Sequence, residues 1–209
     1  MFDALLFDLD GTLIDTESLA IAAGLAAFAE VGHPVSVEFL HGLVGIDLPG
    51  SRRIIGAALP GVDQERLHPI WRAGFDAAVE RGLTLKPGVA QMLAGGRVPM
   101  AVVTSSARAE AHYKLRLSGI AAAFDLVISR DDVTLAKPAP EPYLLAAQRL
   151  GVLPSRCLVF EDSEVGAEAA HRAGCVVVQV PDVVPGTGKW AHHLAENIIQ
   201  GARMAGLVI

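Results

Sequence analysis

The chain has 209 residues, 52% of them hydrophobic, a size that fits one large domain or a main domain with a smaller one. Its 21 glycines and 12 prolines are too few for a disordered chain. Acidic residues outnumber basic ones by 23 to 17 and no block of five or six like charges occurs, so we expect no nucleic acid and no anionic membrane as partner.

The longest apolar tract, residues 19–29, is too short to cross a bilayer, and the N-terminus lacks the basic region of a signal peptide. The two cysteines, Cys157 and Cys175, lie in apolar runs without metal-ligand spacing and are interpreted as buried thiols of a reducing compartment. These features predict a soluble, cytoplasmic protein, which we expect to be a monomer.

Five short apolar runs are predicted to be strands buried on both faces: residues 4–7, 99–103, 126–128, 157–160 and 176–180. Helical spacing is found over residues 107–117, 141–150 and 165–173, and a glycine stands at or just past the end of each. This alternation predicts an α/β fold, a Rossmann-like parallel sheet sandwiched by helices. The final stretch, residues 191–205, is predicted to be a helix that ends at Gly206.

The interval between the first two predicted strands breaks this rhythm. From Asp10 to Thr104 the chain advances 94 residues, about three times a β-α-β step of roughly 30. Residues 17–84 have an almost wholly helical pattern, divided into about four helices by prolines at 34, 49, 60 and 69. We therefore predict a small helical domain of residues 17–84, inserted in an α/β domain of residues 1–16 and 85–209, with residues 85–88 as the return hinge.

Two aspartates follow the first predicted strand in the sequence DLDGT, at positions 8 to 12. Residues two apart on a strand share a side, so Asp8 and Asp10 are expected together at the carboxyl edge of the sheet. Ligands bind at this edge in open α/β sheets, and closely spaced like charges favour a divalent cation or a shared proton. Taken alone, the motif also fits a capped turn, which is the more frequent meaning of so short a pattern.

A second acidic group, Glu161 and Asp162, follows another predicted strand of the same sheet. Hard carboxylate oxygens suit Mg²⁺ better than Zn²⁺. The alternative is that Asp162 or Ser163 only caps the helix that begins near Glu164.

Hydroxyls and a lysine complete the set of polar residues near the predicted strand ends. Thr104 and Ser105 follow a third strand, and Lys137 precedes a proline-rich helix start. Hydroxyls at a helix N-terminus and a compact ammonium can hold a phosphate, although singly Thr104 fits a helix cap and Lys137 a solvated loop cation. Together with the acidic groups they form the inventory of a phosphoryl-transfer site.

These segments, in this order, resemble the four motifs of the haloacid dehalogenase-like (HAD) hydrolase superfamily: residues 8–12, Thr104-Ser105, Lys137-Pro138, and Glu161-Asp162-Ser163 with Gly166. The similarity spans nearly the whole chain. The helical insertion after the first motif resembles the cap domain of the branch that includes β-phosphoglucomutase and many sugar-phosphate phosphatases. The resemblance therefore implies a HAD core with a helical cap.

The resemblance also implies a Mg²⁺-dependent hydrolase of a small-molecule phosphate ester, such as a sugar phosphate, that works through an aspartyl-phosphate. In this scheme Asp8 is the nucleophile and Asp10 the general acid and base. Thr104 and Lys137 hold the phosphoryl oxygens. Further phosphate or substrate contacts are expected from Ser105, Gly11, Thr16 and Gly45, the last in a cap loop of residues 45–47.

The same resemblance implies the ligands of the metal. Mg²⁺ would bind Asp8, Asp162 and the backbone carbonyl of Asp10, with Glu161 beside it as a second or outer carboxylate. A dehalogenase needs neither the metal nor a second acid of this type, so Asp10 together with Asp162 favours phosphoryl transfer.

Two alternatives remain open at this stage. A phosphomutase must grip a second phosphate, but Ala20 and Leu48 stand where the β-phosphoglucomutase pattern has a histidine and an arginine of the cap. Arg52 or Arg53 could compensate, although a solvated helix face is the plainer interpretation. The other alternative is a catalytically idle binding or regulatory module, which would be expected to lose Asp8 or Asp10 first. We therefore favour hydrolysis.

Overall fold

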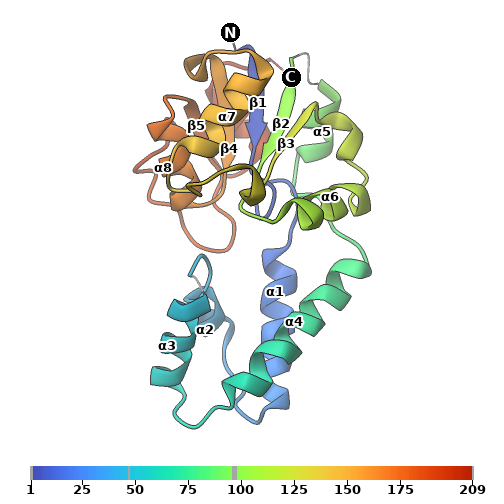
Figure 1. Cartoon of the computed structure of the whole chain (residues 1–209), viewed down its shortest axis with the longest axis vertical. Helices are drawn as coiled ribbons and strands as arrows, with labels where there is room; N and C mark the ends of the chain where they lie inside the picture. The colour runs from blue at the N-terminus through green and yellow to red at the C-terminus, as the bar shows by residue number, and fades with distance from the viewer. Residues whose placement is uncertain (1, 47, 96–97, 209) are drawn as a thin grey trace. The chain divides into compact units, whose positions relative to one another are not determined.

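The computed structural model of the chain describes residues 2–46, 48–95 and 98–208. By the contacts between its residues, the chain divides into two compact units (Figure 1). One consists of Met1–Asp15 and Thr84–Ile209 and is called here the α/β unit. The other, Thr16–Leu83, is called the helical unit.

The α/β unit is built on a parallel sheet, with the order β3-β2-β1-β4-β5-β6 among the described strands. Its strands are β1 (Ala4–Phe7), β2 (Met100–Val103), β3 (Leu126–Ile128), β4 (Cys157–Glu161), β5 (Val176–Gln179) and β6 (His193–Leu194). Every residue of β1, β2 and β4 is buried, as expected for apolar strands covered on both faces. The parallel α/β fold predicted from the sequence is confirmed.

The register of the central strands determines where the site forms. Phe7, the last residue of β1, lies opposite Val102 of β2 and Phe160 of β4. The chain therefore leaves β1 at Asp8 directly beside Glu161, and the Asp8 backbone N–H donates to the Phe160 carbonyl at 3.0 Å. Polar residues that follow these strands consequently gather at one edge of the sheet.

Helices cover the sheet on both faces. Their bounds are α5 (Val89–Gly95), α6 (Arg108–Leu117), α7 (Glu141–Leu150), α8 (Glu164–Arg172) and α9 (Ile198–Met204). One face of the sheet packs on α7 and α8, through a core that includes Leu6, Val159 and Ala167. Helix α9 packs on β5 from the other face, where a Cβ at Gly201 would stand 2.2 Å from Val178 Cγ1, so only glycine allows this close approach.

The C-terminal stretch corrects one prediction. In place of one helix over residues 191–205, the chain forms strand β6 and then the shorter α9. Backbone hydrogen bonds from His192 to Val177 and from Ala195 to Gln179 add β6 to the edge of the sheet. Asn197 is extended and its side chain accepts from the Gln200 N–H at 2.9 Å, which starts the helix at Ile198. Pairing with the sheet edge and this cap outweigh local helix preference.

The helical unit contains α1 (Glu17–Glu30), α2 (Val37–His41), α3 (Leu48–Ala58) and α4 (Gln64–Glu80). Its core includes Phe28, Ile55 and Leu67, and the Trp71 indole N–H donates to the Ala20 carbonyl at 2.8 Å, which joins α4 to α1. Pro69 lies inside α4 and does not end it, contrary to the prediction. It removes one backbone hydrogen bond near the helix start, while packing on both sides of it keeps the helix continuous.

Among the described helices, none combines the length and apolar character needed to cross a membrane.

Candidate active site

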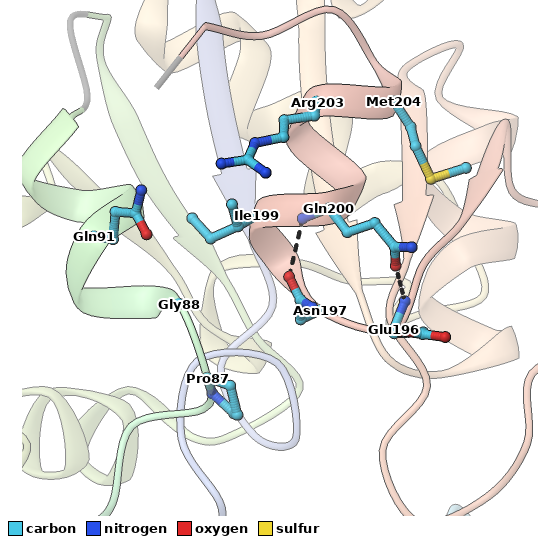
Figure 2. Close-up of a pocket in the computed structure, with 9 residues that line it drawn as sticks. All are labelled: Pro87, Gly88, Gln91, Glu196, Asn197, Ile199, Gln200, Arg203 and Met204. Carbon is cyan, nitrogen blue, oxygen red and sulfur yellow. Dashed lines mark hydrogen bonds between the residues drawn. The ribbon is translucent and has the colours of Figure 1, made fainter.

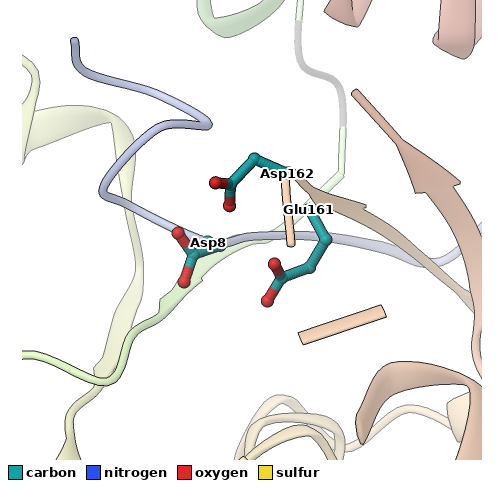
Figure 3. Close-up of side chains that lie close together, drawn as sticks. All are labelled: Asp8, Glu161 and Asp162. Carbon is teal, nitrogen blue, oxygen red and sulfur yellow. The ribbon is translucent and has the colours of Figure 1, made fainter. Parts of the chain in front are cut away.

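Three carboxylates meet at the carboxyl edge of the sheet (Figure 3). Asp8 follows β1, Glu161 ends β4, and Asp162 comes next along the chain. One oxygen of each lies within 4.8 Å of the others. Figure 3 shows Glu161 and Asp162 extending toward the side on which Asp8 lies. The strand order thus brings together residues more than 150 positions apart in the sequence.

Lys137 joins this cluster from the loop before α7. Its ammonium donates to Asp8 Oδ1 at 2.7 Å, to Glu161 Oε1 at 2.6 Å and to the Val103 carbonyl at 2.8 Å. The lysine side chain is 5% exposed. One buried cation therefore connects the ends of β1, β2 and β4. The interpretation of Lys137 as a solvated loop cation is wrong.

Glu161 is fully buried and is held by three donors. Besides Lys137, the Tyr143 hydroxyl donates to Oε1 at 2.6 Å and the Ser163 hydroxyl to Oε2 at 3.2 Å. A Cβ at Gly166 would lie 1.9 Å from Oε1, so α8 can pack against this carboxylate only with glycine at that position. Both oxygens of Glu161 are thus occupied by protein donors, which suits a supporting carboxylate better than a direct metal ligand.

Ser163 also has the structural role considered from the sequence. Its hydroxyl accepts from the Gly166 N–H at 3.1 Å and caps α8. The same hydroxyl therefore starts the helix and donates to Glu161.

The cluster is electrostatically strained when both aspartates are ionised. Burial raises the pKa of Asp8 to about 7, with Glu161 adding to the rise and Lys137 opposing it. Burial, Asp8 and Glu161 raise the pKa of Asp162 well above its ordinary value. Burial alone would lower the pKa of Lys137, but the two neighbouring carboxylates reverse this and raise it. Lys137 is therefore charged, while the aspartates lack a full complement of positive charge.

This donor set fits a hard divalent cation. Asp8 is buried and Asp162 half-buried, and the raised pKa of each carboxyl shows that its negative charge is unfavourable in this place. Bound Mg²⁺ would neutralise that charge. The Thr12 hydroxyl donates to Asp162 Oδ1 at 3.3 Å and orients that side chain. No histidine or cysteine belongs to the cluster among the described residues, so its chemistry does not favour Zn²⁺.

Asp10 lies in a separate network beside the cluster. Its carboxylate accepts from the Lys114 ammonium at 2.8 Å and from the Ser106 hydroxyl at 2.9 Å. Lys114 is 4% exposed and also pairs with Glu110 at 3.0 Å. Burial would lower the pKa of Lys114, but Asp10 and Glu110 raise it instead, so Lys114 carries a charge that steadies the Asp10 carboxylate.

Lys114, Ser106 and Tyr143 were not found from the sequence. Lys114 and Tyr143 lie on helices, outside the residues that follow strands, and only packing brings them to the site. One signal was available: Lys114 stands between the apolar residues Ala111 and Leu115, which places a charge on the buried face of α6.

The remaining predicted residues fall at different places. Thr104 is 4% exposed at the end of β2, and its hydroxyl accepts from the Ser106 N–H at 3.1 Å. Ser105 is exposed beside it. Gly11 turns with φ +85° against Asp162. Their roles toward a phosphate stay predictions.

Two predicted residues belong to the other unit. Thr16 is buried at the N-cap of α1, and Gly45 has φ +74° in the loop after α2. Of the predicted loop of residues 45–47, Asp47 lies outside the described residues. The contacts of Thr16 and Gly45 with a substrate likewise stay predictions.

An open pocket of 540 Å³ lies between α5 and α9 (Figure 2). Two of its polar side chains serve the start of α9: Asn197 caps Gln200, and the Gln200 side chain accepts from the Glu196 N–H at 2.6 Å. None of the acidic cluster lines it. This pocket is therefore separate from the acidic cluster at the sheet edge.

A parallel α/β sheet with carboxylates and a lysine at its carboxyl edge is typical of a class of α/β enzymes. Comparison with known families shows which family of that class the chain belongs to. A model described as a haloacid dehalogenase-like hydrolase matches residues 2–174. The chain belongs to this family of hydrolases, and the resemblance inferred from its motifs is confirmed.

Individual relatives agree with this membership. The fructose-1-phosphate phosphatase YqaB of Escherichia coli is 35% identical over 185 residues, covering 86% of this chain and 96% of that protein. A phosphorylated carbohydrates phosphatase of Thermotoga maritima is 33% identical over 180 residues, covering 82% of each chain. A crystal structure of a HAD family hydrolase from Deinococcus radiodurans R1, with bound phosphate and sodium, has a TM-score of 0.78 at 30% identity, covering 99% of this chain and 89% of that one.

Proposed function

We propose that this protein is a Mg²⁺-dependent phosphomonoester hydrolase that acts on a small sugar phosphate through an aspartyl-phosphate intermediate. The observation that carries the proposal is the cluster of Asp8, Asp162 and Glu161, in which Lys137 is paired with Asp8 and Glu161. It combines a nucleophile, oxygens for a divalent cation and a fixed ammonium for the phosphoryl group. Membership of the hydrolase family supports the same chemistry.

Asp8 is the nucleophile in this proposal. Its Oδ1 is fixed by Lys137, which orients the carboxylate for in-line attack. A carboxylate oxygen forms a bond to phosphorus while the ester O–P bond breaks, and the leaving oxygen takes a proton from Asp10. Asp10, now a carboxylate, accepts a proton from water as the water oxygen bonds to phosphorus and the bond between the Asp8 oxygen and phosphorus breaks. This releases inorganic phosphate and restores the Asp8 carboxylate.

The neighbouring groups supply charge and orientation. Bound Mg²⁺, held by Asp8, Asp162 and the Asp10 carbonyl, would neutralise charge on the transferred group. Thr104 binds an equatorial oxygen, and Lys137 exchanges one of its three hydrogen bonds for another equatorial oxygen when the ester is bound. Lys114 and Ser106 hold the Asp10 carboxylate ready for proton transfer, with bonds of 2.8 and 2.9 Å.

The helical unit is proposed to act as the cap that covers the substrate and sets its identity. A sugar phosphate is favoured because two similar relatives are named as phosphatases of fructose 1-phosphate and of phosphorylated carbohydrates. Substrate contacts from Thr16 and Gly45 belong to this part of the proposal.

A phosphomutase is the second candidate, and the helical unit argues against it. The mutase pattern needs a cap cation for a second phosphate, but Leu48 stands at the arginine position. Of the two arginines that could replace it, Arg52 donates to Glu65 at 2.6 Å on the same unit, which partly balances its charge. The other, Arg53, is exposed and stays a candidate.

Phosphate release from a panel of sugar phosphates tests the proposal. The purified protein is expected to release phosphate with Mg²⁺, to lose this activity in EDTA, and to lose it in the Asp8→Asn variant. Asp3→Asn is the matched control, since Asp3 precedes the other end of β1 and pairs with Arg156 on the surface. Equal activity in wild type and Asp8→Asn would refute the proposal, and an isomerised sugar phosphate without free phosphate would favour the mutase.

A further inference from the structure

Asp182, in the loop after β5, has a buried carboxylate oxygen that no group in the described part of the chain satisfies. Its side chain is 8% exposed. Oδ1 accepts a hydrogen bond from the Lys86 ammonium, but Oδ2 is shielded from solvent and has no hydrogen-bond partner among the described residues. A buried acceptor of this kind costs free energy unless it has a function or a bound partner.

The unsatisfied oxygen lies near Asp162, a member of the acidic cluster. A Cβ built at Gly11 would lie 2.6 Å from Asp162 Oδ2 and 3.4 Å from Asp182 Oδ2. Both oxygens therefore border the same small space above the Gly11 turn. Asp182 nevertheless stands outside the group whose oxygens all lie within 4.8 Å of one another.

Three kinds of partner could satisfy Asp182 Oδ2 at this position. A phosphate oxygen is excluded because two anionic acceptors repel. A direct bond to the same cation as Asp8 and Asp162 is disfavoured because Asp182 is not within the ligand group. A water that the cation polarises is both a donor and short enough to bridge the gap, and Mg²⁺ characteristically keeps several waters.

We propose that Asp182 is an outer-sphere residue of the metal site, and that its Oδ2 accepts a hydrogen bond from a water bound to the cation. This inference rests on the metal dependence proposed above. Acceptors in this position orient the bound water and typically change metal affinity by about 10- to 100-fold when removed.

Lys86 is the counter-ion that keeps Asp182 ionised and oriented. Its backbone N–H donates to the Leu13 carbonyl at 2.9 Å, which fixes the lysine next to the loop that follows β1. Its ammonium occupies Oδ1, so Oδ2, which lies near Asp162, stays available as an acceptor. The Lys86–Asp182 pair is electrically neutral. We therefore expect it to act on the cation site through its hydrogen-bond acceptor and not through a net charge.

Because the pair is neutral, both of its residues can be replaced without changing the net charge of the protein. Mg²⁺ affinity is measured by isothermal titration calorimetry on the whole protein without substrate, in wild type, Asp182→Asn, Lys86→Met, and the Lys86→Met/Asp182→Ala double variant. The double variant removes the acceptor without changing net charge and leaves no buried unpaired ion. We expect its affinity for Mg²⁺ to fall about 10-fold. Asp182→Asn should fall at least as far, because it loses both the acceptor and a negative charge.

Lys86→Met separates this role from that of a purely structural ion pair. It keeps the acceptor and removes a nearby positive charge, so its Mg²⁺ affinity should equal or exceed that of wild type. Thermal unfolding in EDTA checks that each variant folds, and the rise in Tm on adding Mg²⁺ gives a second measure of binding. Asp3→Asn serves as the control for a distant carboxylate.

Two results would overturn the inference: wild-type affinity in the double variant, or equal weakening in Lys86→Met and Asp182→Asn. Failure of the proposed function has a different signature. If wild type itself binds no Mg²⁺ at millimolar concentration, the proposed metal dependence is wrong, and the outer-sphere role of Asp182 is refuted with it.

Discussion

Replacing Lys137 by methionine isolates the effect of its charge at nearly constant side-chain size. The lysine makes three hydrogen bonds, of 2.6 to 2.8 Å, to Asp8, Glu161 and the Val103 carbonyl. Without it, two buried carboxylates face each other with no cation between them. Removing one partner of a buried ion pair costs about 3–5 kcal/mol, and this is the loss of unfolding free energy that we expect at pH 8 without metal.

The size of this loss should depend on pH. Burial raises the pKa of Asp8 to about 7 in the folded protein from an ordinary value of 3.8, and removing Lys137 moves it higher. A raised carboxyl pKa means that the folded state binds the proton more tightly, so stability falls as pH rises through this window. The Lys137→Met defect should accordingly be smaller at pH 5, where Asp8 takes up a proton, than at pH 8.

Urea unfolding followed by circular dichroism in EDTA measures the effect. Lys189→Met is the matched control, because Lys189 is exposed over the Trp190 ring, and it should cost under about 1 kcal/mol. Adding Glu161→Gln to Lys137→Met removes one of the unpaired charges and should recover about 1–3 kcal/mol. A loss below 1 kcal/mol at pH 8, or a double variant no more stable than Lys137→Met, would refute this account of the cluster.

Three further predictions concern the same edge of the sheet. Gly166→Ala would place a Cβ 1.9 Å from the Glu161 carboxylate. This variant should release no phosphate, and its unfolding free energy in urea should fall by about 1–3 kcal/mol. Gly74→Ala is the control and should be tolerated, because the atom nearest to its Cβ would be 3.4 Å away. Lys114→Met should lower kcat about 10-fold or more with little change in KM, and arginine at that position should restore part of the rate; unchanged kcat would contradict a positioning role. The Asp8→Asn variant in EDTA should lose the part of the wild-type decline in stability between pH 4 and 7 that comes from Asp8, which is at most about 1.4 kcal/mol per pH unit for one proton. The part that comes from Asp162 should remain, so its pH profile should be shallower than that of wild type, and parallel profiles by thermal unfolding would contradict the prediction.

Most strands of the sheet could be predicted because a short apolar run in the sequence is enough to indicate a buried strand. The five predicted strands are apolar runs, and each is found within a residue of its predicted bounds. Strand β6 was missed because it has only two residues, His193 and Leu194, whose extension depends on pairing with β5 and not on their own preferences. Edge pairing of this kind leaves no periodic pattern in the sequence.

The same distinction separates the site residues that were predicted from those that were missed. Asp8, Lys137 and Glu161 were expected near one another because parallel strands end at a common edge. Lys114 reaches Asp10 from a helix, and its contact depends on how α6 packs. The sequence gives no direct measure of such packing, although a lysine between buried positions was a usable signal.

Charge balance supports the proposal that the site binds a divalent cation and not a monovalent one. Asp8, Glu161 and Asp162 carry three negative charges when ionised, and Lys137 supplies one positive charge within the cluster. Two negative charges remain in a buried place, where each is costly. In the proposed mechanism a divalent cation would cancel both, and this would allow an anionic ester to approach Asp8. We therefore expect the cation to bind first and the phosphate ester second.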